Sequence, residues 1–305
     1  MAIPVILDTD IGSDIDDTWA LAFMLRCPEL DVKLVVTDRG RPEYRAKLAC
    51  KMLEAAGRTD IPVALGSEWA GNTGQDLQAP CAAGYDLSRY PGRVDPDGLH
   101  AMADVVLTSA EPVTVVAIGP MPTLSRALQQ APDIARDARF VGMHGSLRYG
   151  HKRDRDRVVA EANVVNDPAA CQAVFAAPWD VSITPLDTCG IVQLDGERMA
   201  RVAKSVDALA VAVMENYRVW WENRCARSGK GDVTMCERES TILFDTVAVY
   251  LAFAEDFLGM EDLGVRVTDD GFTRIDGDAK KIRCATEWKD MDAFEELLVT
   301  RLTGA

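Results

Sequence analysis

Five aspartates stand within ten positions near the start of the chain: Asp8, Asp10, Asp14, Asp16 and Asp17. An apolar run precedes them and an apolar pattern at helical spacing follows, which predicts a strand, an acidic turn and a helix. Carboxylates at this density repel one another unless a cation neutralises them, and carboxylate oxygens suit a hard cation such as Ca²⁺ or Mg²⁺. The turn therefore predicts a metal or catalytic site at the carboxyl end of the first strand.

Three other roles compete with this metal site, and the first two match the sequence less well. Helix capping explains one aspartate at the helix start, such as Asp16 or Asp17, but not five. An EF-hand loop counted from Asp8 would need Glu at its twelfth position, where the chain has Trp19. A Mg²⁺-dependent phosphohydrolase of the haloacid dehalogenase type would use Asp8 as nucleophile and Asp10 as acid. This alternative stays open at the level of sequence.

Composition excludes several classes of function. The 305 residues are 48% hydrophobic and 27% charged, with a formal net charge of −15. A surface this acidic disfavours nucleic acids and anionic membranes as partners. No apolar run reaches the length that spans a bilayer. Eight cysteines without a Cys-x-x-Cys pair predict reduced thiols in a cytoplasmic protein, and three scattered histidines disfavour a His-based zinc site.

Strand-like and helical patterns alternate along the chain. Residues 34–37, 61–65 and 113–120 are apolar and strand-like, and residues 43–56 form an amphipathic helix after the first of them. Such alternation implies parallel strands joined by helical crossovers. We predict an α/β fold with an open, mostly parallel central sheet, helices on both faces and a Rossmann-like core. No repeat or linker interrupts the pattern, so residues 1–305 are predicted to form a single domain.

The second part of the chain adds three expectations. Residues 66–96 are rich in Gly, Pro and polar side chains and predict a long loop. Residues 264–275 predict a hairpin that turns at residues 269–271. A final helix is expected at residues 290–302.

Residues 8–17, Asp-Thr-Asp-Ile-Gly-Ser-Asp-Ile-Asp-Asp, resemble the amino-terminal signature of the inosine-uridine preferring nucleoside hydrolase superfamily, Asp-x-Asp-x-Gly-x-Asp-Asp, with two residues inserted. Residues 113–120 resemble the family's central strand and its Gly-Pro turn. Residues 161–168 are similar to its Glu-x-Asn-x-x-x-Asp-Pro segment, and residues 242–249 to its His-Asp-Pro-x-Ala segment. These matches span most of the chain, which makes the resemblance specific. It implies the nucleoside hydrolase fold.

The resemblance also implies roles for particular residues. Five groups would surround one Ca²⁺: Asp10, Asp16, Asp17, the backbone carbonyl of Ile118 and Asp245. The insertion leaves open which of Asp14, Asp16 and Asp17 are ligands. Asp10 would act as general base, with Asp14 as a second catalytic residue.

Three side chains would contact ribose: Asp14, Glu161 and Asn163. Glu161 and Asn163 are two positions apart and would point the same way from an extended segment.

The leaving-group side departs from the family pattern. Members that hydrolyse inosine or uridine carry His where this chain has Phe244, and the family's Asn after the second strand is missing from residues 37–41, Thr-Asp-Arg-Gly-Arg. The leaving group would depart unaided or use another acid, for which His144, His151 and Glu222 are candidates. Arg39, Arg41 and Arg155 would face an anionic leaving group or a phosphate. Tyr217 or Trp221, on a helix over residues 207–225, would stack on the base. Six side chains are therefore candidates for leaving-group contact: Tyr217, Trp221, Phe244, Arg39, Arg155 and His144.

The predicted function is Ca²⁺-dependent hydrolysis of an N-ribosidic bond in a ribonucleoside or related compound, as in purine or pyrimidine salvage. A Ca²⁺-bound water would be the nucleophile. The resemblance also implies a homodimer or homotetramer. Besides the phosphohydrolase, a catalytically idle ribosyl-binding homologue is an alternative, because the phenyl ring of Phe244 cannot donate a proton.

Overall fold

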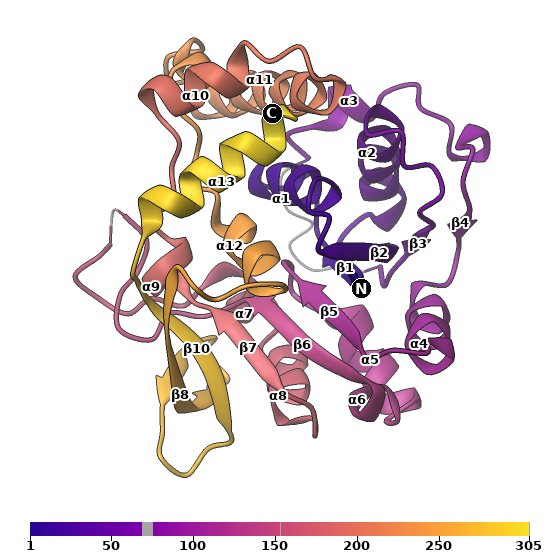
Figure 1. Ribbon diagram of the computed structural model, residues 1–305, viewed down its shortest axis with the longest axis vertical. Coiled ribbons are helices and arrows are strands. Elements are labelled where there is room, and N and C mark those ends of the chain that lie inside the picture. Colours follow the sequence, from indigo (N-terminus) through magenta and orange to yellow (C-terminus); the bar gives the residue numbers. More distant parts are fainter. Residues whose placement is uncertain (69–75, 153, 305) are drawn as a thin grey trace.

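The computed structural model describes residues 1–68, 76–152 and 154–304. Strands in these residues form one ten-stranded sheet in the order β4-β3-β2-β1-β5-β6-β7-β10-β8-β9. The strands are β1 (Ile3–Thr9), β2 (Leu30–Thr37), β3 (Val63–Leu65), β4 (Val94–Asp95), β5 (Val113–Ala117), β6 (Ala138–Met143), β7 (Val181–Thr184), β8 (Leu258–Val267), β9 (Thr273–Ile275) and β10 (Lys281–Trp288). Neighbours from β4 to β10 pair in parallel, and β8 pairs antiparallel with β10 and with β9. This confirms the predicted open, mostly parallel sheet (Figure 1).

Helices cover both faces of the sheet. They are α1 (Asp16–Leu25), α2 (Pro42–Ala55), α3 (Ala79–Ala82), α4 (Gly98–Thr108), α5 (Pro122–Gln130), α6 (Ile134–Asp137), α7 (Ala162–Asn166), α8 (Pro168–Ala176), α9 (Leu186–Cys189), α10 (Gly196–Ala203), α11 (Ala208–Ser228), α12 (Phe244–Leu251) and α13 (Met291–Thr303). In β1, Val5 and Leu7 belong to a core shared with α1, α2, α12 and α13. Ile6 faces the opposite core, shared with α4, α5 and α8. Alternation along the strand therefore builds two cores, one on each face.

The end of the chain contains one strand that the sequence analysis did not assign. The hairpin of β8 and β9 turns at residues 269–271 as predicted, and α13 is the predicted final helix. Between them lies β10, which pairs in parallel with β7 and antiparallel with β8. It therefore joins the hairpin to the parallel part of the sheet. The single-domain organisation of residues 1–305 stays a prediction.

Residues 69–75 of the predicted 66–96 loop lie outside the described residues. The described remainder contains α3, a 3-10 turn at Leu87–Arg89 and β4. Among the described helices, none is both long and apolar enough to cross a lipid bilayer.

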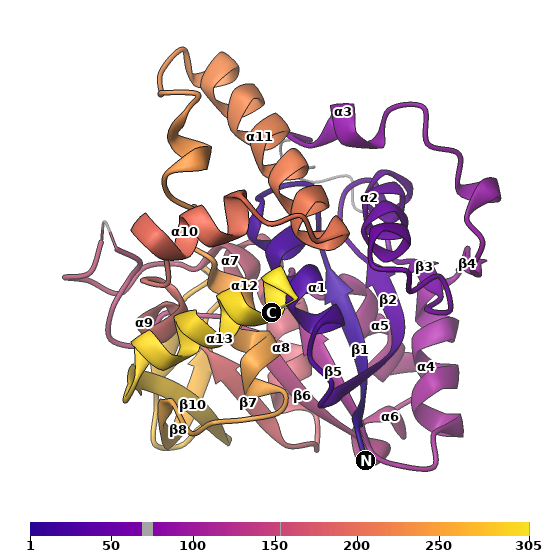
Figure 2. The same cartoon turned by 45° about the horizontal axis from the view of Figure 1, so that its top comes forward.

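The parallel strands bring the ends of distant segments to one edge of the sheet. Asp10 follows β1, Ile118 follows the neighbouring β5, and His144 follows β6 beside it. Helix α12 packs against α1 and β6, so the residues at its start approach the same edge. Figure 2 shows α11 crossing near α1 and α2 with its carboxyl-terminal end projecting from the body of the protein. These elements surround the candidate site.

Candidate active site

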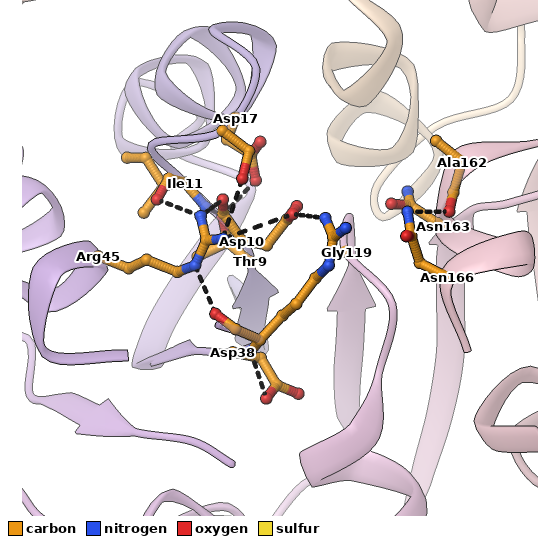
Figure 3. A network of polar contacts seen from close by, with 12 residues as sticks. Thr9, Asp10, Ile11, Asp17, Asp38, Arg45, Gly119, Ala162, Asn163 and Asn166 are labelled. Atoms are coloured by element: carbon orange, nitrogen blue, oxygen red, sulfur yellow. Dashed lines mark hydrogen bonds and ion pairs between the residues drawn. The ribbon is translucent and has the colours of Figure 1, made fainter. Parts of the chain in front are cut away.

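The turn between β1 and α1 is held in a tight conformation. Gly12 has φ +110, and a Cβ there would lie 2.7 Å from the Tyr44 ring, so both backbone and space require glycine. The buried Arg45 side chain donates hydrogen bonds to the Ile11 carbonyl (2.9 Å), to the Asp10 carbonyl and to Ser13 Oγ (2.9 Å) (Figure 3). The backbone that carries these aspartates is therefore held in place by the Arg45 side chain.

These aspartates line a cavity of about 810 Å³ at the carboxyl edge of the sheet. Its wall comes from the β1–α1 turn, the ends of β5 and β6, the segment before and within α7, the late part of α11 and the start of α12. The predicted site residues that line it are Asp10, Asp14, Asp16, Asp17, Arg39, Ile118, His151, Glu161, Asn163, Phe244 and Asp245. The structure thus brings together the whole predicted metal and ribose set, from segments more than 200 positions apart.

Three of the carboxylates form a buried cluster. Oxygens of Asp16, Asp17 and Asp245 all lie within 4.8 Å of one another. Burial raises the pKa of each well above its usual range, and the negative charge of the neighbouring carboxylates raises it further. Thr9 Oγ1 donates a hydrogen bond of 2.5 Å to Asp17 and holds it in place. Three ionised carboxylates buried this close together would destabilise the folded protein, and a cation bound between them would offset that cost.

Asp10 and Asp14 lie beside this cluster in different surroundings. Asp10 is buried and accepts an ion-paired hydrogen bond of 2.9 Å from Arg39 Nη1. Arg39 has φ +65, an uncommon conformation for a residue with a side chain, and its backbone amide donates to Asp38 (2.8 Å). Asp14 is exposed to the cavity. An arginine therefore orients the candidate general base, while Asp14 is accessible to a substrate.

Asp38 is a buried carboxylate behind this ion pair. It also accepts hydrogen bonds of 2.8 Å from the Thr123 amide and hydroxyl. Burial raises the pKa of Asp38 to about 6, although these hydrogen bonds lower it. Asp38 does not line the cavity, and its role is to hold the turn after β2.

The expectation that Glu161 and Asn163 project from an extended segment is wrong. Glu161 is the N-cap of α7 and accepts hydrogen bonds from the amides of Asn163 (2.8 Å), Val164 (3.2 Å) and Gly145 (3.1 Å). Burial raises its pKa to about 7 against the lowering effect of these bonds. A carboxylate that caps two free amides at the start of a helix explains why the helix begins here. Both side chains still line the cavity.

Asn163 connects the strand ends around the site. Its Nδ2 donates hydrogen bonds to the carbonyl oxygens of Ile118 (3.1 Å) and Met143 (3.0 Å). It therefore fixes the direction of the Ile118 carbonyl, which is the predicted backbone ligand. A carbonyl oxygen has two lone pairs, so this hydrogen bond leaves room for a cation.

The aromatic helix α11 presents a different pair of residues from the predicted one. Tyr217 is buried, packs edge-on against Trp19 and donates to the Glu239 carbonyl (2.9 Å), and Trp221 donates to the Asp232 carbonyl (2.7 Å). Among the described residues, the cavity wall includes neither of them. It includes Trp220 and Arg224 instead, one turn apart on the same helix. Their i, i+4 spacing was visible in the sequence, but which side faced the cavity was not.

Trp220 is tied directly to the acidic turn. Its Nε1 donates a hydrogen bond of 3.0 Å to the Ser13 carbonyl. The Arg224 guanidinium lies 5.2 Å above its ring. Trp220 is 1% exposed, so it forms a fixed wall of the cavity, while Arg224 is exposed.

Two other leaving-group candidates lie outside the cavity wall. His144 is fully buried among Phe140 and Phe175, and its Nε2 donates to the Gly119 carbonyl (3.1 Å). Burial lowers the pKa of His144 to about 4, so it is a neutral structural residue and not an acid. Arg155 Nη1 donates to the Leu186 carbonyl (3.2 Å) and secures a loop. Both residues anchor backbone around the site.

Asp8 cannot serve as the nucleophile of a phosphohydrolase. Its side chain is fully buried, neither of its oxygens has a hydrogen-bond partner, and it is not part of the cavity wall. Burial and the charges of Asp38 and Asp10 raise the pKa of Asp8 well above its usual range. A carboxyl group buried beneath the turn and outside the cavity wall has no access to a substrate.

The sequence and the fold have counterparts among known proteins. Residues 5–296 match the family model described as inosine-uridine preferring nucleoside hydrolase. The chain belongs to this family. As a member of this family it is a hydrolase that acts on N-glycosyl bonds, and the phosphohydrolase alternative is not supported.

Individual relatives show the extent of the similarity. The pyrimidine-specific ribonucleoside hydrolase RihA of Escherichia coli O7:K1 is 30% identical over 236 residues, which cover 70% of this chain and 71% of the relative. The solved plant nucleoside hydrolase PpNRh1 covers 100% of both chains with a TM-score of 0.81 at 22% identity. The purine-preferring ribonucleoside hydrolase from Gardnerella vaginalis aligns with 99% of this chain and 98% of its own, with a TM-score of 0.77 at 19% identity. The two structures confirm the nucleoside hydrolase fold.

Proposed function

We propose that this nucleoside hydrolase cleaves the N-ribosidic bond of ribonucleosides in a Ca²⁺-dependent reaction with water as nucleophile and Asp10 as general base. The observation that carries the proposal is the buried cluster of Asp16, Asp17 and Asp245 at the wall of the cavity. Like charges are placed this closely in a protein interior when a cation compensates them.

The donor atoms fit a hard divalent cation. Asp10, Asp16, Asp17 and Asp245 offer carboxylate oxygens, and Ile118 offers its carbonyl. Oxygen-only donor sets suit Ca²⁺ or Mg²⁺ better than softer metals, and the larger number of donors favours Ca²⁺. When bound there, the ion would acidify a water ligand and hold the ribosyl hydroxyls.

The residues of the chain supply the remaining functions. Asp10, oriented by Arg39, takes the proton of the attacking water. Asp14, Glu161 and Asn163 line the cavity where they can hold ribose hydroxyls. As the C–N bond breaks, positive charge develops on the sugar, and the surrounding carboxylates stabilise it as in other glycoside cleavage.

A substrate panel tests this proposal. Release of reducing sugar is measured with uridine, inosine, their 2′-deoxy analogues and their 5′-monophosphates, with Ca²⁺ present. RihA of E. coli is named as pyrimidine-specific, so a pyrimidine nucleoside is the first substrate. We expect sugar release from ribonucleosides and a large loss with 2′-deoxy analogues.

The same panel separates the alternatives. Binding of ribonucleosides without any release would identify an idle ribosyl-binding protein. Faster sugar release from the 5′-monophosphates than from the nucleosides would indicate that arginines near the cavity recognise an anion. By family resemblance we also propose a homodimer or homotetramer, which light scattering on the purified protein would test.

A further inference from the structure

Hydrolysis of a nucleoside requires a proton for the leaving base. The bond between C1′ and the base nitrogen breaks, the electron pair stays with the base, and water supplies a hydroxyl to C1′. Asp10 takes one proton from that water under the proposed function. The departing base must gain a proton from another group, because a free base anion is a poor leaving group.

The start of α12 cannot supply this proton. Phe244 lines the cavity there, beside the carboxylate cluster, and a phenyl ring has no proton to donate. Of the three histidines, all of which the structure describes, His151 lines the cavity. Its ring stands edge-on to Phe244, with centroids 6.5 Å apart and an interplanar angle of 88°. An imidazole therefore faces the same part of the cavity as Phe244, but comes from a different segment.

The backbone of His151 is held against α9. A Cβ at position 190 would lie 2.8 Å from the Cα of His151, so Gly190 permits the close approach. The amide of Lys152 donates to the Gly190 carbonyl (2.8 Å). Arg155 Nη1 donates to the Leu186 carbonyl (3.2 Å) in α9 itself. The position of His151 in the cavity wall is thus set by contacts on both sides of it.

A carboxylate accompanies the imidazole. Asp154 Oδ2 lies 3.5 Å from His151 Nε2, and Asp154 also lines the cavity. The His151 carbonyl accepts a hydrogen bond of 2.8 Å from the Asp154 amide, so the two residues are also joined through their backbones. A carboxylate at this distance can orient the imidazole ring.

We propose that His151 is the general acid for the leaving base and that Asp154 positions it. This inference rests on the proposed function and names the residues that would protonate the leaving base. The imidazolium of His151 gives its proton to the base nitrogen as the C–N bond breaks. His151 then regains a proton from solvent, and Asp10 releases to solvent the proton that it took from the attacking water. Net consumption is one water for each nucleoside.

The decisive experiment compares two kinds of leaving group. Uridine and inosine need a proton on the departing base, whereas p-nitrophenyl β-D-riboside releases a stabilised phenolate that needs none. For H151A we expect a fall in kcat on uridine and inosine of about 100-fold or more. The same variant should retain a rate close to wild type on the nitrophenyl riboside. H151Q, which keeps a polar side chain, should show the same selective loss and serves if H151A folds poorly.

The chain offers a matched control and a second variant. His100 on the surface of α4 also pairs with an aspartate three positions away, Asp97, so H100A should leave the rates on both substrates unaffected. D154N should lower the nucleoside rate less than H151A does, again with little effect on the nitrophenyl riboside. A residue with only a structural role would lower both rates together.

Each outcome of the comparison has a definite meaning. Equal loss on both substrates, or loss on neither, would overturn the role of His151 while leaving the proposed function intact. A wild-type protein that releases ribose from neither substrate would contradict the proposed function, and the assignment of His151 would fall with it.

Discussion

The two sides of the cavity are built in opposite ways. On the acidic side, Asp16, Asp17 and Asp245 are between 3% and 5% exposed, and backbone and side-chain contacts fix the turn that carries the first two. On the leaving-group side, the His151 and Asp154 side chains are each 32% exposed and come from a loop. Buried like charges give a site that is unfavourable without a cation, whereas partly exposed groups can exchange protons with solvent.

From this difference we expect the two sides of the cavity to act on different parts of the substrate. Under the proposed function, the acidic side acts on the sugar and the water, which every ribonucleoside substrate shares. The leaving-group side would act on the base, which differs between substrates. Variants on the acidic side should therefore affect all ribosides alike, and variants on the other side should discriminate among leaving groups.

The largest effect is expected for Asp10→Asn. Loss of the general base should lower kcat by about 10²- to 10⁴-fold. The loss should be the same for uridine and p-nitrophenyl riboside, in contrast to H151A, because water must be deprotonated for both. Steady-state rates on the two substrates check this, with Asp133→Asn on the surface as control. Loss confined to uridine would contradict the division between the two sides.

Asp245→Asn should weaken binding of the cation by the folded protein. Ca²⁺ at 100 times its dissociation constant should stabilise the wild type by about 2.7 kcal/mol, because it binds only the folded state. The variant should lose most of this gain. In a chelator it should be more stable than wild type, because one buried like charge is gone. Thermal unfolding with and without Ca²⁺ measures both effects. A chelated variant less stable than wild type would show that the cluster is satisfied without a cation.

Stability of the metal-free protein should fall as pH rises. Burial raises the pKa of Asp38 to about 6 and that of Glu161 to about 7, above their ordinary values of 3.8 and 4.5. The folded state therefore binds these protons more tightly than the unfolded state does. Their contribution is complete below the ordinary values and is lost as pH rises through about 6 and 7, at on the order of 1 kcal/mol per group and pH unit. Thermal unfolding in chelator from about pH 5 to about pH 8 checks this direction. Constant or rising stability would contradict it.

The smallest effect is expected from a pair of tryptophan variants. Trp220→Phe removes the hydrogen bond to the Ser13 carbonyl and part of the cavity wall. We expect KM for nucleosides to rise about threefold to tenfold, as for the loss of one hydrogen bond. Trp221→Phe is the matched control and should leave KM unchanged, because Trp221 faces Asp232. A larger rise in KM for Trp221→Phe than for Trp220→Phe would indicate that Trp221 contacts the base.

Most of the sheet and the acidic side could be predicted from the sequence. The predicted strands at β1, β2 and β5 were followed by turns, and parallel order placed those turns at one edge. Asp10 and Ile118 meet there because their positions depend on strand order, and Asp245 joins them from the start of α12. Strand β10 was missed because its place between β7 and β8 depends on pairing with distant partners.

The leaving-group side was harder to predict because it depends on tertiary contacts of single residues. On α11 a rotation of one position separates Trp220, which faces the cavity, from Trp221, which does not. His144 and His151 were equal candidates in the sequence. Packing of His144 against Phe140 and Phe175 made it a neutral core residue, and the approach of Gly190 placed His151 in the wall. Asp154 was hidden in a loop of mixed charge whose fold the sequence did not reveal.

Under the proposed function, cleavage of the ribosidic bond requires a divalent cation at the carboxylate cluster. The most direct test strips the protein with a chelator, then measures ribose release from uridine while Ca²⁺ is added back, with Asp245→Asn in parallel. We predict no release from the stripped protein, saturable recovery with Ca²⁺ in the wild type and little recovery in the variant. Full activity in the stripped protein, or equal recovery in the variant, would contradict a cation-dependent reaction at this cluster.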